Sequence, residues 1–197
     1  MEYKNLLDII SELQFYAKKV HNEDVEKFTN LILEAKHIFV AGAGRSGFAA
    51  RGFANRLLHL GLDVHFVGEP TTPPIKEGDL LIIGSGSGTT SGLVTMAQKA
   101  KAQNAMIATI TISPTKTIGS MADAVITLPG TTRLLDDGEN EVNGSIQPIG
   151  SMFEQLSWLT YDAMIMTLKE KTKQRDREKS IKAIKEIKKY MLQNMFV

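Results

Sequence analysis

The sequence contains no cysteine, which excludes disulfide bonds, thiolate nucleophiles and thiolate metal ligands. It also has little excess charge, because 23 basic residues nearly balance 22 acidic ones and leave a net charge of +1. Proteins that bind nucleic acid as their main partner usually carry a large basic surface. We therefore expect no nucleic acid partner.

Long apolar runs are missing as well. No window approaches the roughly 20 apolar residues that a membrane-spanning helix needs, so we expect no membrane association. The first residues, MEYKNLLDIISEL, carry charges at helical spacing and lack the uninterrupted apolar core of a signal peptide. The expected location is the cytoplasm.

Apolar residues make up 43% of the 197 residues, enough for one domain with a full hydrophobic core. Their spacing predicts two leading helices, one at residues 2–20 and one near 22–35 for which Asn22 is the expected N-cap. The apolar face of the first helix consists of Leu6, Leu7, Ile10, Leu13 and Ala17.

After residue 36, short β-branched segments alternate with helical patterns. The predicted strands lie at 37–42, 64–68, 80–84, 105–111 and within 122–129. The predicted helices lie at about 46–60, 89–102, 151–171 and 176–193, with an irregular segment at 131–150. This alternation predicts an α/β fold in which helices cover both faces of a parallel sheet. We expect a single domain over 1–197, divided into N-terminal helices (1–36), the core (37–150) and C-terminal helices (151–197).

Two glycine–hydroxyl loops follow predicted strands: the GAGRSG loop at 42–47 and the GSGSGTT loop at 84–90. The carboxyl ends of parallel strands are where such sheets bind ligands. Glycines let several N–H groups point at one ligand, and a helix N-terminus adds partial positive charge. Both loops suit a phosphate monoester, although serine and glycine before a helix also form simple caps and turns. The candidate ligands are Ser46, Ser85, Gly86, Ser87, Gly88, Thr89 and Thr90.

The GAGRSG loop also matches the G-x-G-x-x-G fingerprint of dinucleotide-binding proteins. Glu69 ends the second predicted strand, about where an acid that binds the ribose of NAD belongs. A nicotinamide enzyme, however, has no need of a second hydroxyl loop after the third strand. The phosphate-monoester interpretation is therefore favoured over NAD.

Four segments together resemble one family: GAGRSG, RLLHLGLDVHFVGEPTTPPI, GDLLIIGSGSGTT and QPIGSMFEQ. They resemble the sugar isomerase (SIS) domain and, more narrowly, the 6-phospho-3-hexuloisomerases, over nearly the whole chain. The resemblance implies a three-layer sandwich of flavodoxin- or Rossmann-like type, with a five-stranded parallel sheet flanked by helices. It also implies a homotetramer with active sites near subunit contacts. At Thr89 relatives often carry a charged residue, which makes this position a variable neighbour of the loop.

The implied reaction interconverts 3-hexulose 6-phosphate and fructose 6-phosphate through an enediol, without metal or nucleotide cofactor. It would be the second step of formaldehyde fixation by the ribulose monophosphate route, with 3-hexulose-6-phosphate synthase as functional partner. Moving a carbonyl along a carbon chain needs a general base, a proton donor for the oxygens and a grip on the phosphate.

Glu154 is the predicted base, because Pro148, Gly150, Phe153 and Glu154 match the family pattern P-x-G-x-x-F-E. A first-turn glutamate that simply favours the helix dipole is the alternative. His59 matches the family's H-L-G and is the second catalytic candidate, as acid or oxygen-polarising group. It lies about four turns from the GAGRSG loop, so we expect it to serve the site of a neighbouring subunit.

The remaining candidates have weaker support. Arg45 is a candidate to neutralise phosphate or an enediolate oxygen, or else a surface arginine paired with an acid. Glu69 is a further possible base, and His65 is expected to be structural. The residues left without an assigned role, or with only a possible contact to the sugar, are His21, His37, Thr71 and Thr72. Phe153 and Trp158 are expected in the core or at an interface.

Two other functions stay open from the sequence. An isomerase of another sugar phosphate, such as arabinose 5-phosphate or sedoheptulose 7-phosphate, would share the GSGSGTT loop. A sensor of sugar phosphates would use the same fold without chemistry. The N-terminal helices show neither the spacing of a helix-turn-helix nor a basic recognition helix, which disfavours the sensor.

Overall fold

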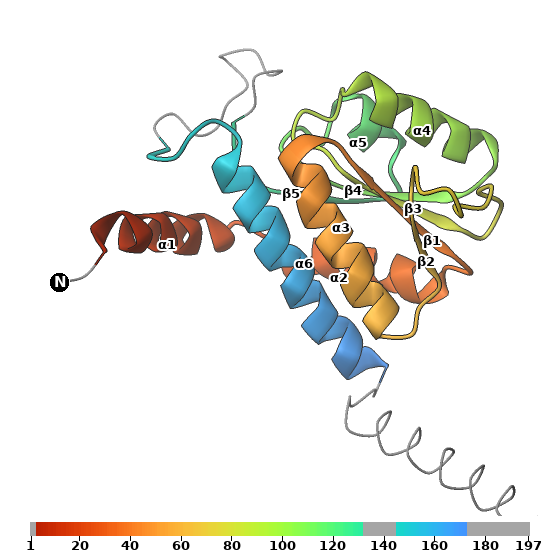
Figure 1. Cartoon of the computed structure of the whole chain (residues 1–197), viewed down its shortest axis with the longest axis horizontal. Helices are drawn as coiled ribbons and strands as arrows, with labels where there is room; N and C mark the ends of the chain where they lie inside the picture. The colour runs from red at the N-terminus through yellow and green to blue at the C-terminus, as the bar shows by residue number, and fades with distance from the viewer. Residues whose placement is uncertain (1–2, 132–144, 173–197) are drawn as a thin grey trace, which may run out of the picture.

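A computed structural model describes residues 3–131 and 145–172 of the chain, and the elements alternate as the sequence predicts. The helix predicted at 176–193 and most of the irregular segment at 131–150 lie outside the described residues. The elements, labelled in Figure 1, are α1 (Lys4–Ala17), α2 (Asn22–Glu34), β1 (Ile38–Gly42), α3 (Gly44–His59), β2 (Val64–Phe66), β3 (Leu80–Gly84), α4 (Ser91–Ala102), β4 (Met106–Thr111), α5 (Thr117–Met121), β5 (Ala124–Thr127) and α6 (Ser151–Lys171).

The five strands form one parallel sheet in the order β2-β1-β3-β4-β5, which confirms the predicted α/β fold. In this flavodoxin-like order, the chain leaves β1 toward one edge and returns at β3 toward the other. The point between β1 and β3 is therefore the topological switch, where sheets of this kind bind ligands. The two strands are paired so that Gly42 lies opposite Gly84.

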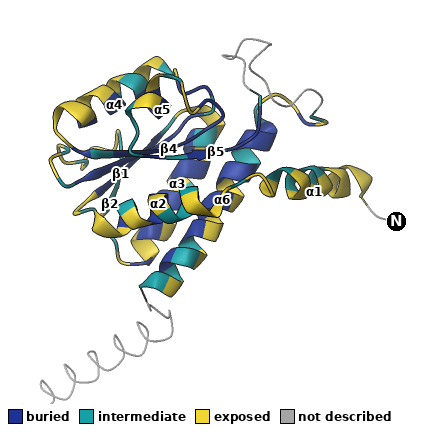
Figure 2. Cartoon of the chain, turned by 180° about the vertical axis from the view of Figure 1, so that it is seen from behind, coloured by how far each residue is buried: buried dark blue, intermediate teal, exposed yellow. Residues whose placement is uncertain are grey.

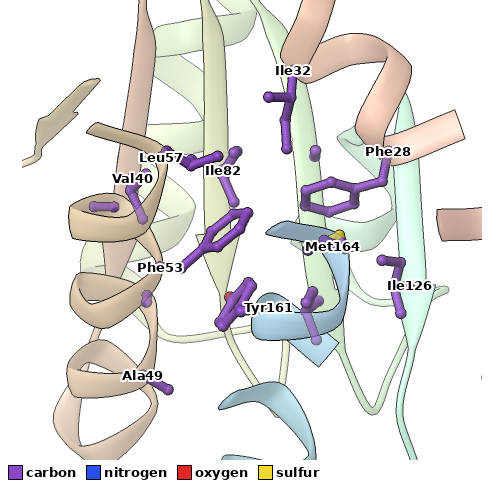
Figure 3. Close-up of a cluster of buried hydrophobic side chains, with 14 of the residues drawn as sticks. Phe28, Ile32, Val40, Ala49, Phe53, Leu57, Ile82, Ile126, Tyr161 and Met164 are labelled. Carbon is purple, nitrogen blue, oxygen red and sulfur yellow. The ribbon is translucent and has the colours of Figure 1, made fainter. Parts of the chain in front are cut away.

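Helices cover both faces of the sheet, as expected for strands such as LLIIG of β3 that are buried along their whole length. One apolar core lies between the sheet and α2, α3 and α6, and a second lies between the sheet and α4 and α5. Figure 2 shows the buried sheet as the middle layer of the three. In the first core the rings of Phe53 and Tyr161 stack with centroids 4.4 Å apart, which joins α3 to α6 (Figure 3).

Several predicted boundaries are wrong by a few residues. The helices expected from Ser46 and Thr89 begin at Gly44 and Ser91. His21, and not Asn22, is the N-cap of α2, and its side chain makes no capping hydrogen bond. Helix α5 was not predicted, because its five residues are too few to display a period.

Helix α1 forms as predicted but projects from the side of the molecule (Figure 1). None of its residues is buried, and the side chains of Leu6 and Ile10 are each 51% exposed. Leu13 and Tyr16, nearer the C-terminal end, pack against the first core. Its predicted apolar face is thus only partly covered within one chain. No helix among the described residues is long and apolar enough to cross a membrane.

Candidate active site

The GAGRSG and GSGSGTT loops leave the sheet side by side, because their first glycines, Gly42 and Gly84, are paired in the sheet. The fingerprint glycines allow the backbone of β1 to approach α3. A Cβ atom on Gly47 would lie 2.8 Å from the carbonyl oxygen of Gly42, and one on Gly42 would lie 2.8 Å from the Cα of Gly47. Gly44 has φ of +58°, a conformation that favours glycine. Packing alone therefore requires this motif, whatever ligand it meets.

The GSGSGTT loop is held by its own hydroxyl groups. The Oγ of Ser85 accepts a hydrogen bond from the N–H of Gly88, and the Oγ of Ser87 accepts one from Thr89, each at 3.3 Å. Both serines are buried. Because each hydroxyl acts as acceptor here, its own hydrogen remains available to a ligand. Thr90 is the N-cap residue of α4, yet its side chain makes no capping hydrogen bond. The loop thus offers hydroxyl donors that the helix does not use.

Ser46 is engaged differently. Its hydroxyl donates to the carbonyl oxygen of Ala43 at 2.8 Å, within the first turn of α3. It must rotate away from that carbonyl before it can donate to a phosphate. Ser46 is therefore less ready to donate than Ser85 or Ser87.

A cleft of about 440 Å³ opens over the switch point, within the range of small-molecule sites. It joins the two loops to the start of α6. Of the residues predicted from the sequence, those lining it are Arg45, Ser46, Ser85, Gly86, Ser87, Thr90 and Glu154. Gly88 and Thr89 are not among its lining residues: Gly88, with φ of +66°, is buried behind the loop, and Thr89 is exposed beside it.

Glu154 meets Arg45 in this cleft. The Oε2 of Glu154 lies 2.6 Å from the Nε of Arg45, with side-chain exposures of 18% and 66%. Burial raises the pKa of Glu154 above its usual value, and the Arg45 guanidinium offsets part of that rise. A carboxylate with a raised pKa is suited to take up and return a proton near neutral pH. The guanidinium beside it can stabilise a negative oxygen on the same substrate.

The start of α6 positions this carboxylate. Gly150 is the N-cap with φ of +89°, which lets the chain turn sharply out of the QPIG segment. The N–H of Glu154 then donates to the carbonyl oxygen of Gly150 at 3.1 Å in the first turn. Ile149, Gly150 and Phe153 also line the cleft, which the sequence did not predict, although Gly150 and Phe153 belong to the family pattern that marks Glu154.

His59 lies at the other end of α3, exposed and outside the cleft of its own chain. The length of the helix separates it from Gly44 by roughly 22 Å at 1.5 Å per residue. The other histidines lie outside the cleft as well. His37 contacts the Asp79 carboxylate at 2.8 Å, and His65 contacts Asp63 at 3.0 Å.

In the structure, Glu69, the acidic residue that the NAD interpretation needs, lies away from the cleft. The Oε1 of Glu69 accepts a hydrogen bond from Arg51 at 2.7 Å, and this pair lines a separate pocket of about 310 Å³. The Thr72 hydroxyl donates to the carbonyl oxygen of Phe66 at 3.0 Å, away from the cleft. Among residues 3–131 and 145–172, no three histidine or carboxylate side chains form a set that could hold a metal.

A hydroxyl-rich cleft at the switch point of a parallel sheet is typical of proteins that bind phosphorylated ligands. Residues 31–133 match the SIS domain, and the chain belongs to the SIS domain family. This confirms the family resemblance of the sequence motifs.

Two curated relatives are named 3-hexulose-6-phosphate isomerase. The Bacillus subtilis protein is 47% identical over 164 residues, which are 83% of this chain and 87% of that protein. The Mycobacterium gastri protein is 42% identical and covers 83% of this chain and 80% of its own length. A solved structure from Methanococcus jannaschii, for which the function of 3-hexulose-6-phosphate isomerase was inferred, has a TM-score of 0.75 at 35% identity, covering 88% of this chain and 94% of that one.

Proposed function

We propose that the chain isomerises D-arabino-3-hexulose 6-phosphate to fructose 6-phosphate. The observation that carries the proposal is the carboxylate of Glu154, 2.6 Å from Arg45, in a cleft that also contains the GSGSGTT loop. The names of the Bacillus and Mycobacterium relatives support the choice of sugar phosphate.

In the proposed reaction, the phosphate binds the Ser85 and Ser87 hydroxyls and the backbone N–H groups of the GSGSGTT loop. Glu154 removes the proton from C2 of the 3-ketose, and the electron pair of that C–H bond forms the C2–C3 double bond of an enediol. The negative charge that develops on the substrate oxygen is stabilised by Arg45. Glu154 then returns the proton to C3, while the hydroxyl proton of O2 is lost and O3 gains one, so that the carbonyl forms at C2 and C3 carries a hydroxyl group. The oxidation states of the two carbons exchange, so the step needs no redox cofactor.

His59 would complete this site from a neighbouring subunit, as the acid or oxygen-polarising group. Its distance from the cleft of its own chain supports that arrangement. The exposed side chains of Leu6 and Ile10 on α1 give the chain apolar surface for assembly. We propose a homotetramer, which sedimentation equilibrium would test. Gly88 and Thr89, whose N–H groups donate to the Ser85 and Ser87 hydroxyls, would maintain the shape of the loop, so the loop N–H groups that bind the phosphate would be those of the other residues.

We further propose that all 197 residues act as one domain in the cytoplasm, where phosphorylated sugars are made and consumed. There the chain would take its substrate from 3-hexulose-6-phosphate synthase and perform the second step of formaldehyde fixation by the ribulose monophosphate route. The relatives' names support the reaction, and the pathway is the one that the family resemblance implies.

The test is proton NMR of fructose 6-phosphate in D2O with the purified protein and EDTA, with the product assayed in the same tube. We expect the C3 hydrogen to be replaced by deuterium and 3-hexulose 6-phosphate to form. Exchange at C1 would instead reveal a 1,2-isomerase. Absence of both exchange and product would refute the proposal in favour of another sugar phosphate or a sensor.

The base is tested by Glu154→Gln, which keeps the shape of the side chain. Turnover should fall about 10²- to 10⁴-fold, the usual contribution of a general base, while fructose 6-phosphate still binds. Glu69→Gln is the matched control and should retain wild-type turnover, because Glu69 pairs with Arg51 outside the cleft. Near-normal turnover in Glu154→Gln would mean that another group is the base.

A further inference from the structure

The hydroxyl group of Tyr161 is buried and has no hydrogen-bond partner among the residues that the structure describes. The residue is 2% exposed, its ring stacks on Phe53, and its oxygen is among the buried side-chain atoms without a hydrogen bond. Burial also raises the pKa of Tyr161, so the group keeps its proton and is a donor. A buried donor left unpaired destabilises a protein and calls for an explanation.

The position of this hydroxyl supplies one. A Cβ atom built on Gly84 would lie 2.9 Å from the Tyr161 oxygen and 3.7 Å from the carbonyl oxygen of Ser46. Gly84 begins the GSGSGTT loop, and Ser46 belongs to the GAGRSG loop. The unpaired donor thus lies where both loops leave the sheet, beneath the cleft. Figure 3 shows the Tyr161 ring beside Phe53 in the core.

Tyr161 also shares its helix with the proposed base. Glu154 and Tyr161 are two turns apart on α6, which places them on the same side of the helix. Helix α6 therefore brings a carboxylate to the cleft and a hydroxyl next to Gly84, directly before the lining residue Ser85. The absence of a side chain at Gly84 leaves room for that hydroxyl.

We propose that Tyr161 is a positioning residue for the phosphate-binding loop, an inference that rests on the function proposed above. When a sugar phosphate binds, the backbone at the Gly84–Ser46 junction shifts, and the Tyr161 hydroxyl donates to a carbonyl oxygen there. Binding thus gives the Tyr161 hydroxyl a hydrogen-bond partner. The free-energy cost of an unpaired buried donor is therefore present in the free protein and absent from the complex.

The test is Tyr161→Phe, which keeps the ring and removes only the hydroxyl. Loss of an unpaired buried donor should raise the melting temperature of the free protein. Loss of the new hydrogen bond should weaken fructose 6-phosphate binding about 2- to 10-fold, measured by calorimetry in the Glu154→Gln background. In the wild-type background KM should rise with kcat nearly unchanged. Tyr16→Phe, at a half-buried tyrosine of α1, is the matched control and should change none of these.

Each other outcome overturns the inference. A higher melting temperature with unchanged affinity would mean that the hydroxyl has no role in binding, and a lower melting temperature would mean that it is already bonded in the free protein. Turnover by the wild-type enzyme tests the proposed function separately. If fructose 6-phosphate fails to bind, inorganic phosphate replaces it as the probe. A loop that binds neither overturns the inference together with the phosphate site.

A second variant tests the geometry independently of activity. Gly84→Ala should destabilise the protein because its Cβ meets the Tyr161 oxygen. In the double variant Gly84→Ala/Tyr161→Phe that contact is gone, so the melting temperature should recover. If Gly84→Ala destabilised the protein equally with and without Tyr161→Phe, the Tyr161 hydroxyl would not lie next to Gly84, and the proposal would be wrong.

Discussion

Replacing Ser87 with alanine isolates one hydroxyl group of the GSGSGTT loop. In the free protein this oxygen accepts a 3.3 Å hydrogen bond from the N–H of Thr89, which is exposed and can bond to water instead. Stability should therefore change by less than about 0.5 kcal/mol, or roughly 2 °C in melting temperature. A hydrogen bond to a charged phosphate contributes about 1.5–3 kcal/mol. The dissociation constant of fructose 6-phosphate should then rise about 10- to 150-fold.

The assay is calorimetric titration of fructose 6-phosphate in the Glu154→Gln background, where the ligand is not turned over. Ser85→Ala is the contrasting variant. Ser85 accepts from the N–H of Gly88, and both residues are buried, so its loss leaves a donor unpaired and should cost about 1–3 kcal/mol of stability. That corresponds to a melting temperature lower by roughly 2–12 °C. Unchanged affinity in Ser87→Ala would refute the assignment of this loop as the phosphate site.

Three further predictions concern other parts of the site. Arg45→Met removes the cation that lowers the pKa of Glu154, so that pKa should rise further and the acidic limb of the profile of kcat/KM against pH should move to higher pH. An acidic limb that does not move would mean that Arg45 does not influence the pKa of the catalytic base. Gly47→Ala places a Cβ atom 2.8 Å from the carbonyl oxygen of Gly42 in β1, so the free energy of unfolding, measured in urea, should fall by about 1–3 kcal/mol. Unchanged stability would contradict this close contact. Glu12 on α1 accepts hydrogen bonds of 2.7 and 3.2 Å from the segment 145–147, and Glu12→Ala removes them. The variant should stay folded, but its kcat/KM should fall about 2- to 10-fold in steady-state kinetics. Unaltered kinetics would mean that this contact does not help to position the cleft.

The sheet and both loops were predictable because their signals are local. Segments such as LLIIG are buried along their length and end in glycine, so the pattern of residue types alone identifies them as strands. The hydroxyl groups of GSGSGTT follow a strand directly, and the ends of parallel strands share one edge of the sheet. Neither inference requires knowledge of contacts between distant segments.

The remaining features depend on contacts between distant segments. The Arg45–Glu154 pair joins the first loop to the last described helix, and no local pattern reveals that contact. The sequence also left open whether the serines of GSGSGTT cap a helix, whereas in the structure they accept loop N–H groups. For helix α1, the apolar face predicts the helix itself correctly. The pattern does not tell whether this chain or another one covers that face.

The residues that match the family cover only part of the cleft. Residues 31–133 include both glycine–hydroxyl loops, whereas α6, with Glu154 and Tyr161, lies beyond them. In the proposed mechanism, the loops that bind the phosphate lie inside the matched range, whereas Glu154, the proposed base, lies on a helix outside it. Loss of the Glu154 carboxylate alone would therefore leave the proposed phosphate site in place. A descendant changed in this way would retain a sugar phosphate without altering it, and so turn an enzyme into a receptor.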